Sequence, residues 1–351
     1  MTDPVLICGG AGFIGTNVAA RLCEAGAPVL VYDDLSRPGV ERNIQWLRST
    51  YGSLVDFERG DIRDSRLLRT CVRQASAVYH FAAQTAVTTS VVSPRNDFDV
   101  NAVGAITLLE ELRQLRFPIP LLFTSTNKVY GDLNGIALRK RGSRYEPQHS
   151  GVLANGIDEK CALSFHSPYG CSKGAADQYV LDYARTYGLP NVVFRMSCIY
   201  GPHQCGTEDQ GWVAHFLLQA ISGRPISLYG DGMQVRDVLY VDDLVDAMLL
   251  AQQHATRLKG EAFNIGGGPR NTTSLLELIE LIGELEGEPV SVRFDDWRVG
   301  DQRYYVSDTR RFQTATGWKP RVGVREGVQR LHQWLLENNV ASTMALQRGV
   351  A

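Results

Sequence analysis

The stretch VLICGGAGFIG, residues 5–15, decides the fold that we expect for this chain. Four apolar residues are followed at once by three spaced glycines, and a helical pattern of apolar residues continues beyond them. A strand, a glycine turn and a helix in this order are the context that a dinucleotide-binding fingerprint requires. Gly9 would make the tight turn, Gly12 would let the backbone approach a pyrophosphate, and Gly15 would let the helix pack closely. The cofactor contacts expected in this turn are Gly9, Gly12, Phe13, Ile14 and Gly15.

A second apolar run, residues 28–32, ends in Asp33. A carboxylate at the end of the second strand accepts hydrogen bonds from the adenosine ribose and repels a 2′-phosphate. This position predicts NAD rather than NADP as the cofactor, with Asp34 as a neighbouring contact. Arg37 is close enough in sequence to favour a 2′-phosphate instead, although a solvated loop charge is the simpler interpretation.

Strands and helices alternate through residue 195, which predicts βαβ units and a parallel sheet. Buried strands are expected at residues 5–8, 29–32, 77–81, 121–123 and 192–194, and long helices at 101–113 and 169–185. Later elements are expected at 212–221, 238–241, 263–266, 274–286 and 327–337. We therefore predict an α/β fold, a Rossmann-type doubly wound parallel sheet with a smaller, interleaved C-terminal α/β substrate lobe. The expected division is an NAD-binding domain over 1–196, which also receives about 235–266, and a lobe that is mainly for substrate over 197–351.

Further residues are expected at the rim of the cofactor site because they follow or flank apolar strands. In an open parallel sheet, ligands bind at the carboxyl ends of the strands. The expected rim residues are Asp61, near the adenine, with Ile62, Ala82, Ala83, Gln84 and Asn101.

Tyr169 and Lys173 are the candidate catalytic residues, and both are also expected to contact the cofactor. Their spacing puts both side chains on one helical face, one turn apart. A nearby ammonium favours the phenolate, so the pair could take a proton from a sugar hydroxyl while hydride leaves the same carbon. Thr126, at the end of an apolar strand, could hydrogen-bond the same oxygen. Tyr and Lys share this spacing on many ordinary helices, and Thr commonly caps a strand end.

Acidic and basic residues are nearly equal in number, with a net charge of −2 and a sequence pI of about 6.4. No basic block points to nucleic acid or to an anionic membrane. The seven cysteines are scattered without metal-ligand spacing, so we expect reduced thiols, no metal and a cytoplasmic location. We expect neither a leader peptide nor a membrane span.

From residue 5 to about residue 334 the chain resembles the extended short-chain dehydrogenases/reductases, in the group of nucleotide-sugar epimerases and dehydratases. Residues 125–133, 165–179, 209–213 and 232–238, with 88–90, resemble more narrowly the 2-epimerases of the CDP-paratose and CDP-tyvelose type. The resemblance implies transient oxidation of a nucleotide-diphosphate hexose to a ketone and its reduction on the opposite face, at C2 of a CDP-hexose. Two alternatives stay open: a UDP- or dTDP-hexose 4-epimerase, and a non-catalytic NAD-binding sensor or scaffold.

The resemblance also implies substrate contacts. These are Thr126, Asn127, Cys198, Arg236 and Arg303, the two arginines holding the diphosphate. Related 4,6-dehydratases have Asp and Glu where this chain has Asn127 and Lys128, which disfavours dehydration. Cys198 stands where many relatives have an Asn, so the donor nucleotide is open.

Two features of the architecture remain open at this stage. Residues 131–168 form a long polar segment before Tyr169, either a lid over the sugar or surface filler. By family analogy, the helices after Asn101 and Tyr169 would pair across a two-fold axis in a homodimer. An amphipathic helix that covers its own sheet would give a similar pattern.

Overall fold

The computed structural model describes residues 3–298, 300–338 and 340, so most of the expected substrate lobe is included and 341–351 lie outside it. A seven-stranded sheet has the order β12-β8-β5-β4-β1-β2-β3. Every neighbouring pair in this sheet is parallel. The strands are β1 (Val5–Cys8), β2 (Val29–Asp33), β3 (Val55–Arg59), β4 (Ala77–His80), β5 (Leu121–Thr126), β8 (Asn191–Met196) and β12 (Glu261–Ile265). The predicted doubly wound, Rossmann-type sheet is confirmed.

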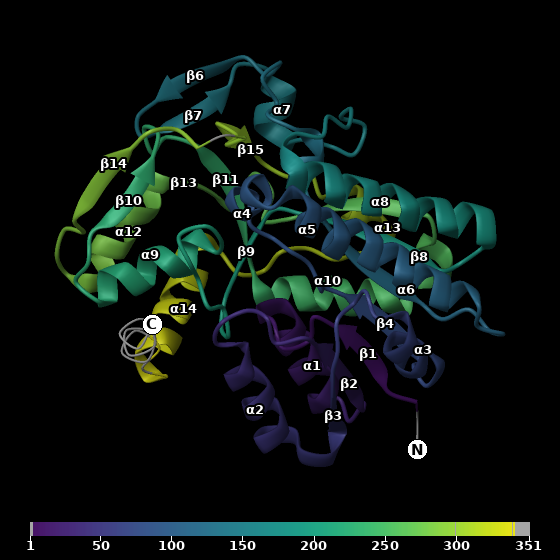
Figure 1. The fold of residues 1–351 in the computed structure, drawn as a ribbon. Helices are drawn as coiled ribbons and strands as arrows, with labels where there is room; N and C mark the ends of the chain where they lie inside the picture. Colours follow the sequence, from purple (N-terminus) through teal and green to yellow (C-terminus); the bar gives the residue numbers. More distant parts are fainter. Residues whose placement is uncertain (1–2, 299, 339, 341–351) are drawn as a thin grey trace.

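Helices cover both faces of this sheet (Figure 1). Val5 and Ile7 of β1 pack into one core, whereas Leu6 and Cys8 pack into the other, because successive side chains point to opposite faces. Burial on both faces explains why these strands read as continuous apolar runs. The first core is covered by α1 (Phe13–Glu24), α2 (Val40–Tyr51), α10 (Val241–Gln253), α11 (Ala255–Leu258) and α13 (Arg310–Thr316). The second is covered by α3 (Ser65–Arg73), α6 (Gly104–Arg113) and α8 (Ser167–Tyr187).

Short helical segments connect these layers. They are η1 (Gly52–Leu54), α4 (Val87–Val92), α5 (Pro94–Phe98), η2 (Asp99–Val103) and η3 (Asn127–Tyr130). Segment η2 is a π-helical turn that runs into α6, so the helix expected at 101–113 begins inside this turn.

A smaller lobe lies beside the large sheet (Figure 1). Its strands are β9 (Cys198–Tyr200), β10 (Ile226–Tyr229), β11 (Val235–Tyr240), β13 (Thr272–Ser274), β14 (Val292–Asp295) and β15 (Tyr304–Tyr305). Its helices are α9 (Trp212–Ile221), α12 (Leu275–Glu286) and α14 (Val324–Glu337), which pack into one apolar core. Strand β11 hydrogen-bonds β9, β13 and β15, so residues 235–240 belong to this smaller sheet. The chain returns to the large sheet only with α10 and β12, and again with α13.

The segment between Tyr130 and Tyr169 is folded in part. It forms a hairpin of β6 (Leu138–Arg141) and β7 (Arg144–Pro147), followed by α7 (Ser150–Asn155). The hairpin is bound to the smaller lobe, because Arg144 pairs with Glu277 at 2.6 Å and Tyr145 N donates to Met233 O.

No helix in the described ranges is long and apolar enough to cross a membrane.

Candidate active site

The glycine turn between β1 and α1 has room for backbone only. Gly9 has a φ of +80°, and a Cβ there would lie 2.5 Å from the backbone N of Ala82. A Cβ on Gly15 would lie 2.5 Å from Gly10 Cα. Around Gly12 the nearest atom to an added Cβ is Gly9 O, at 3.2 Å, so the chain is more open there. Gly12 is also the N-cap of α1, where free backbone N–H groups and the helix dipole favour an anion.

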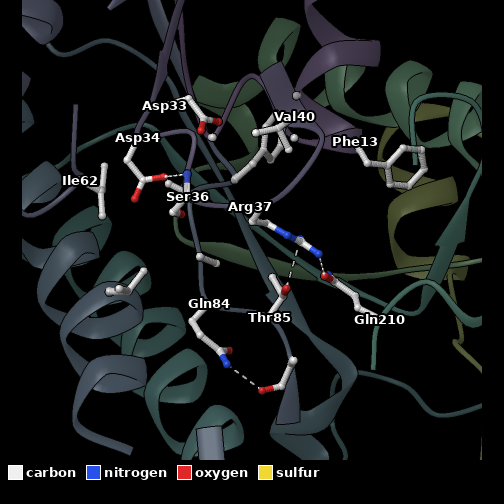
Figure 2. Close-up of a pocket in the computed structure, with 18 of the residues that line it drawn as sticks. Phe13, Asp33, Asp34, Ser36, Arg37, Val40, Ile62, Gln84, Thr85 and Gln210 are labelled. Atoms are coloured by element: carbon white, nitrogen blue, oxygen red, sulfur yellow. Dashed lines mark hydrogen bonds between the residues drawn. The ribbon is translucent and has the colours of Figure 1, made fainter. Parts of the chain in front are cut away.

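A cavity of about 530 Å³ lies over this turn. Its volume is within the range of pockets that hold small molecules and cofactors. Twelve residues predicted for the cofactor line it: Gly9, Gly12, Phe13, Ile14, Gly15, Asp33, Asp34, Asp61, Ile62, Ala82, Ala83 and Gln84. Figure 2 shows several of these side chains.

Both carboxylate oxygens of Asp33 accept hydrogen bonds from backbone N–H groups. Its Oδ2 accepts a hydrogen bond from Ala11 N at 3.0 Å, and its Oδ1 accepts one from Leu35 N at 2.9 Å. Arg37 reaches across the cavity rim and donates to Thr85 and Gln210, away from the Asp33 carboxylate (Figure 2). Sequence reasoning did not foresee this contact, because Gln210 is far away along the chain.

Asn101 lies behind the cofactor cavity and is not among the residues that line it. Its side chain accepts from Gln84 N at 2.9 Å and donates to Gln84 O at 3.0 Å and to Ser172 Oγ at 3.0 Å. It therefore shapes the loop after β4 and links this loop to α8. We infer that Asn101 supports the cofactor site through Gln84.

Tyr169 and Lys173 are brought together with Thr126, as the sequence predicts. Tyr169 and Lys173 are 9% and 4% exposed on α8, and the side chains of Tyr169 and Thr126 are hydrogen-bonded. Lys173 Nζ donates to Thr124 O at 2.6 Å and lies 4.3 Å from the centroid of the Phe123 ring. Helix α8 and the carboxyl end of β5 thus hold a phenol, a hydroxyl and an ammonium in one place.

This group lies next to two cavities. Tyr169 N donates to Ser90 Oγ in α4 at 3.2 Å. Of the residues just before Ser90, Thr89 lines the cofactor cavity, whereas Thr88 lines a second cavity of about 240 Å³. Tyr169 and Lys173, which we also expected to contact the cofactor, are buried, and neither is among the residues that line the cofactor cavity.

The electrostatics of the pair differ from the expectation. We expected Lys173 to lower the pKa of Tyr169, but burial raises this pKa to about 12, although the hydrogen bond to Thr126 opposes the rise. Burial also lowers the pKa of Lys173 to about 8. The reason is that the Lys173 ammonium is turned to the carbonyl of Thr124, so desolvation dominates the pKa of both groups.

The second cavity contains several of the expected substrate contacts. Cys198 and Arg236 line it, together with Lys128, Arg298 and Asp301. Arg236 Nη2 pairs with Asp301 Oδ1 at 2.7 Å. Burial raises the pKa of the Cys198 thiol.

Arg303 and Asn127 are placed differently from the other expected contacts. Arg303 is exposed and lies 5.3 Å from the Trp297 ring centroid, outside the set that lines the second cavity. Arg298 lies in that cavity instead, 3.6 Å from the Tyr229 ring centroid and 3.3 Å from a Glu208 oxygen. Both arginines lie in an irregular segment, so no sequence period could indicate which of them faces the cavity. Asn127 is buried and donates to Gln302 Oε1 at 3.2 Å.

The sequence model of the NAD dependent epimerase/dehydratase family matches residues 5–266. The chain belongs to this family. The CDP-paratose 2-epimerase of Salmonella typhi is 41% identical over 339 residues, covering 94% of this chain and 98% of that protein. A Thermotoga maritima UDP-glucose 4-epimerase, solved with UDP-glucose, has a TM-score of 0.80 at 31% identity and covers 95% and 99% of the two chains.

A third relative was solved with its cofactor. The Bacillus cereus UDP-glucuronic acid 4-epimerase, in complex with UDP-glucuronic acid and NAD, has a TM-score of 0.82 at 25% identity, with 95% and 99% coverage. The predicted family, enzyme class and NAD cofactor are confirmed by these findings. The large cavity of our chain fits NAD, because Gly9 and Gly15 leave no room for side chains in the turn and the Asp33 carboxylate is held at the end of β2.

Proposed function

We propose that this protein epimerises a nucleotide-diphosphate hexose at C2, with a CDP-hexose of the paratose and tyvelose type as its substrate. The observation that carries the proposal is the pairing of Thr126 with Tyr169, whose neighbours Thr89 and Lys128 line the cofactor cavity and the second cavity, respectively. The choice of C2 and of cytidine is supported by the 41% identical relative from Salmonella typhi.

In the proposed mechanism, Tyr169 accepts the proton of the C2 hydroxyl, and Thr126 orients that hydroxyl. NAD supplies a reversible hydride acceptor at the same carbon. Lys173 lies one helical turn from Tyr169 with its ammonium on the carbonyl of Thr124, so it would favour the phenolate only after turning toward Tyr169. After the ketosugar turns, the opposite face of the carbon would be toward the cofactor site, and Tyr169 returns the proton to the same oxygen. No cofactor is consumed.

Asn127 and Lys128 argue against dehydration as the net reaction. An amide cannot exchange a proton as an acid, and an ammonium is a poor replacement for a carboxylate base. Asn127 is also buried against Gln302, where it holds the segment that carries Asp301.

The test is to incubate the NAD-loaded protein with CDP-, UDP- and dTDP-hexoses in D₂O and to identify the products by NMR. A glucose- or paratose-configured donor should give the manno- or tyvelo-configured product, without deuterium at carbon. A galacto-configured product would instead establish the 4-epimerase alternative. Bound NAD without any product would favour the sensor or scaffold alternative.

We also propose that the protein is a cytoplasmic homodimer. Exposed apolar side chains lie on the helices that would pair, namely Val103 in η2 and Tyr179 and Tyr187 in α8. Others lie on the preceding short helices α4 and α5, where Val91, Val92 and Phe98 are exposed. All seven cysteines are free thiols, which suits a reducing compartment. Sedimentation showing a monomer at micromolar concentration would refute the dimer.

A further inference from the structure

Lys128 joins the predicted catalytic group to the second cavity. It lies in η3, two residues after Thr126, and its backbone N donates to Thr126 Oγ1 at 3.2 Å. Its side chain lines the 240 Å³ cavity. Lys128 therefore lies within one short turn of the hydroxyl that orients the reacting sugar.

The Lys128 ammonium has no acidic partner within ion-pair distance in the part of the chain that the structure describes. Its Nζ donates to Gly300 O at 3.0 Å, which uses one of three N–H groups. The two arginines of the cavity are already paired, Arg236 with Asp301 and Arg298 with Glu208. Burial, followed by the nearby charge of Arg236, lowers the pKa of Lys128 to about 8. The cavity therefore holds one ammonium that has no carboxylate within ion-pair distance among the described residues, beside two arginines that are paired, so an anion bound there would use the free N–H groups of Lys128.

We propose that Lys128 binds the diphosphate of the substrate at the phosphate next to the hexose. This inference rests on the proposed function and adds a positioning residue to it. The sugar-side phosphate is favoured because Lys128 adjoins Thr126, whereas Arg298 contacts Tyr229 and Glu208. An anchor at that phosphate would hold the molecule while the ketosugar turns between its two faces.

Paired nucleotides test this contact directly. CDP has the sugar-side phosphate and CMP lacks it, so their affinities are measured by calorimetry on NAD-loaded wild type and Lys128→Met. The matched control is Lys259→Met, because Lys259 is exposed and precedes β12 at the opposite end of the strands. We expect Lys128→Met to weaken CDP by about 10- to 100-fold, as for a lost charge-assisted hydrogen bond, and to change CMP by less than about two-fold.

Other outcomes would overturn the proposal. Equal weakening of CDP and CMP would show that Lys128 acts only through its bond to Gly300, and an unchanged CDP affinity would exclude the contact. If the wild-type protein prefers another nucleotide base, the same affinities are measured with UDP and UMP or with dTDP and dTMP. Failure of wild type to bind any of these diphosphates would also refute it.

Turnover gives an independent measurement. If the anchor is lost, the ketosugar should leave before it is reduced, so that the hydride stays on the cofactor and the absorbance of reduced nicotinamide accumulates. Wild type and Lys259→Met should not accumulate it. If the wild-type protein binds CDP through Lys128 but does not epimerise a substrate at C2, only the proposed function is refuted. If the wild-type protein epimerises its substrate at C2 but Lys128→Met prefers CDP over CMP as strongly as wild type does, only the Lys128 inference is refuted.

Discussion

Replacing Tyr169 by Phe tests the mechanism most directly. The change removes only the phenolic oxygen, which is hydrogen-bonded to Thr126, and keeps the buried ring on α8. The loss of one buried hydrogen bond should cost about 1 kcal/mol of unfolding free energy. We therefore expect the variant to fold and to retain NAD.

The rate should respond far more strongly than the stability. A positioned acid–base group is worth about 10²- to 10⁴-fold, which corresponds to about 3–5 kcal/mol of activation free energy. The groups next to Tyr169 are poor substitutes for it in this role: Lys173 donates to Thr124 O, and the Thr126 hydroxyl is a weak base at neutral pH. Epimerisation should accordingly fall by at least about 10²-fold.

A second tyrosine on the same helix supplies the control. Tyr183 OH donates to Glu110 Oε1 at 2.6 Å, so Tyr183→Phe also removes a phenolic hydrogen bond from α8. This variant should keep its rate within a few-fold. The assays are product formation by NMR, bound NAD after desalting, and thermal unfolding. A loss of ten-fold or less in Tyr169→Phe, or a similar loss in both variants, would refute the assignment of Tyr169 as the base.

Three further predictions concern the cofactor site and Lys173. Asp33→Ala should weaken NAD and narrow its advantage over NADP in calorimetric titrations; a wild-type preference for NADP would contradict the role of Asp33. Gly9→Ala should lose NAD binding, measured by fluorescence titration, because its Cβ would lie 2.5 Å from Ala82 N at a φ of +80°; unaltered NAD affinity would contradict the tight turn. The pKa of Lys173 is lowered by burial from 10.5 to about 8, so the unfolded chain binds more protons between these values and stability should rise with pH there. Lys173→Met should flatten this rise in pH-dependent denaturant unfolding, and an unchanged slope would show that Lys173 does not titrate as expected.

Local patterns in the sequence were sufficient for much of the fold. The strand expected at 5–8 is β1, and the helix expected at 212–221 is α9. The first is predicted by a short apolar run before a glycine turn and the second by a helical period, and both signals act within a few positions. Strand β3 was not predicted, because its side chains are only partly buried at the edge of the sheet and show no apolar run.

The chemistry of the site was predictable where spacing alone brings residues together. One helical turn separates Tyr169 from Lys173, and three glycines mark a turn in which Gly9 and Gly15 leave no room for a Cβ. A carboxylate at the end of the second strand, Asp33, is similarly a consequence of strand order. These features follow from backbone geometry that neighbouring residues impose on one another.

Only the tertiary structure decided which distant groups meet. It put Arg298 rather than Arg303 in the second cavity, Asn101 behind the Gln84 loop, and the Lys173 ammonium against Thr124. It also placed the side chain of Lys128 in the cavity with Arg236 and no carboxylate of its own within ion-pair distance in the described ranges. The physical reason is that burial and pairing are set by contacts between elements far apart in the chain. Those contacts determine both the pKa values of the buried groups and the place where an anion can bind.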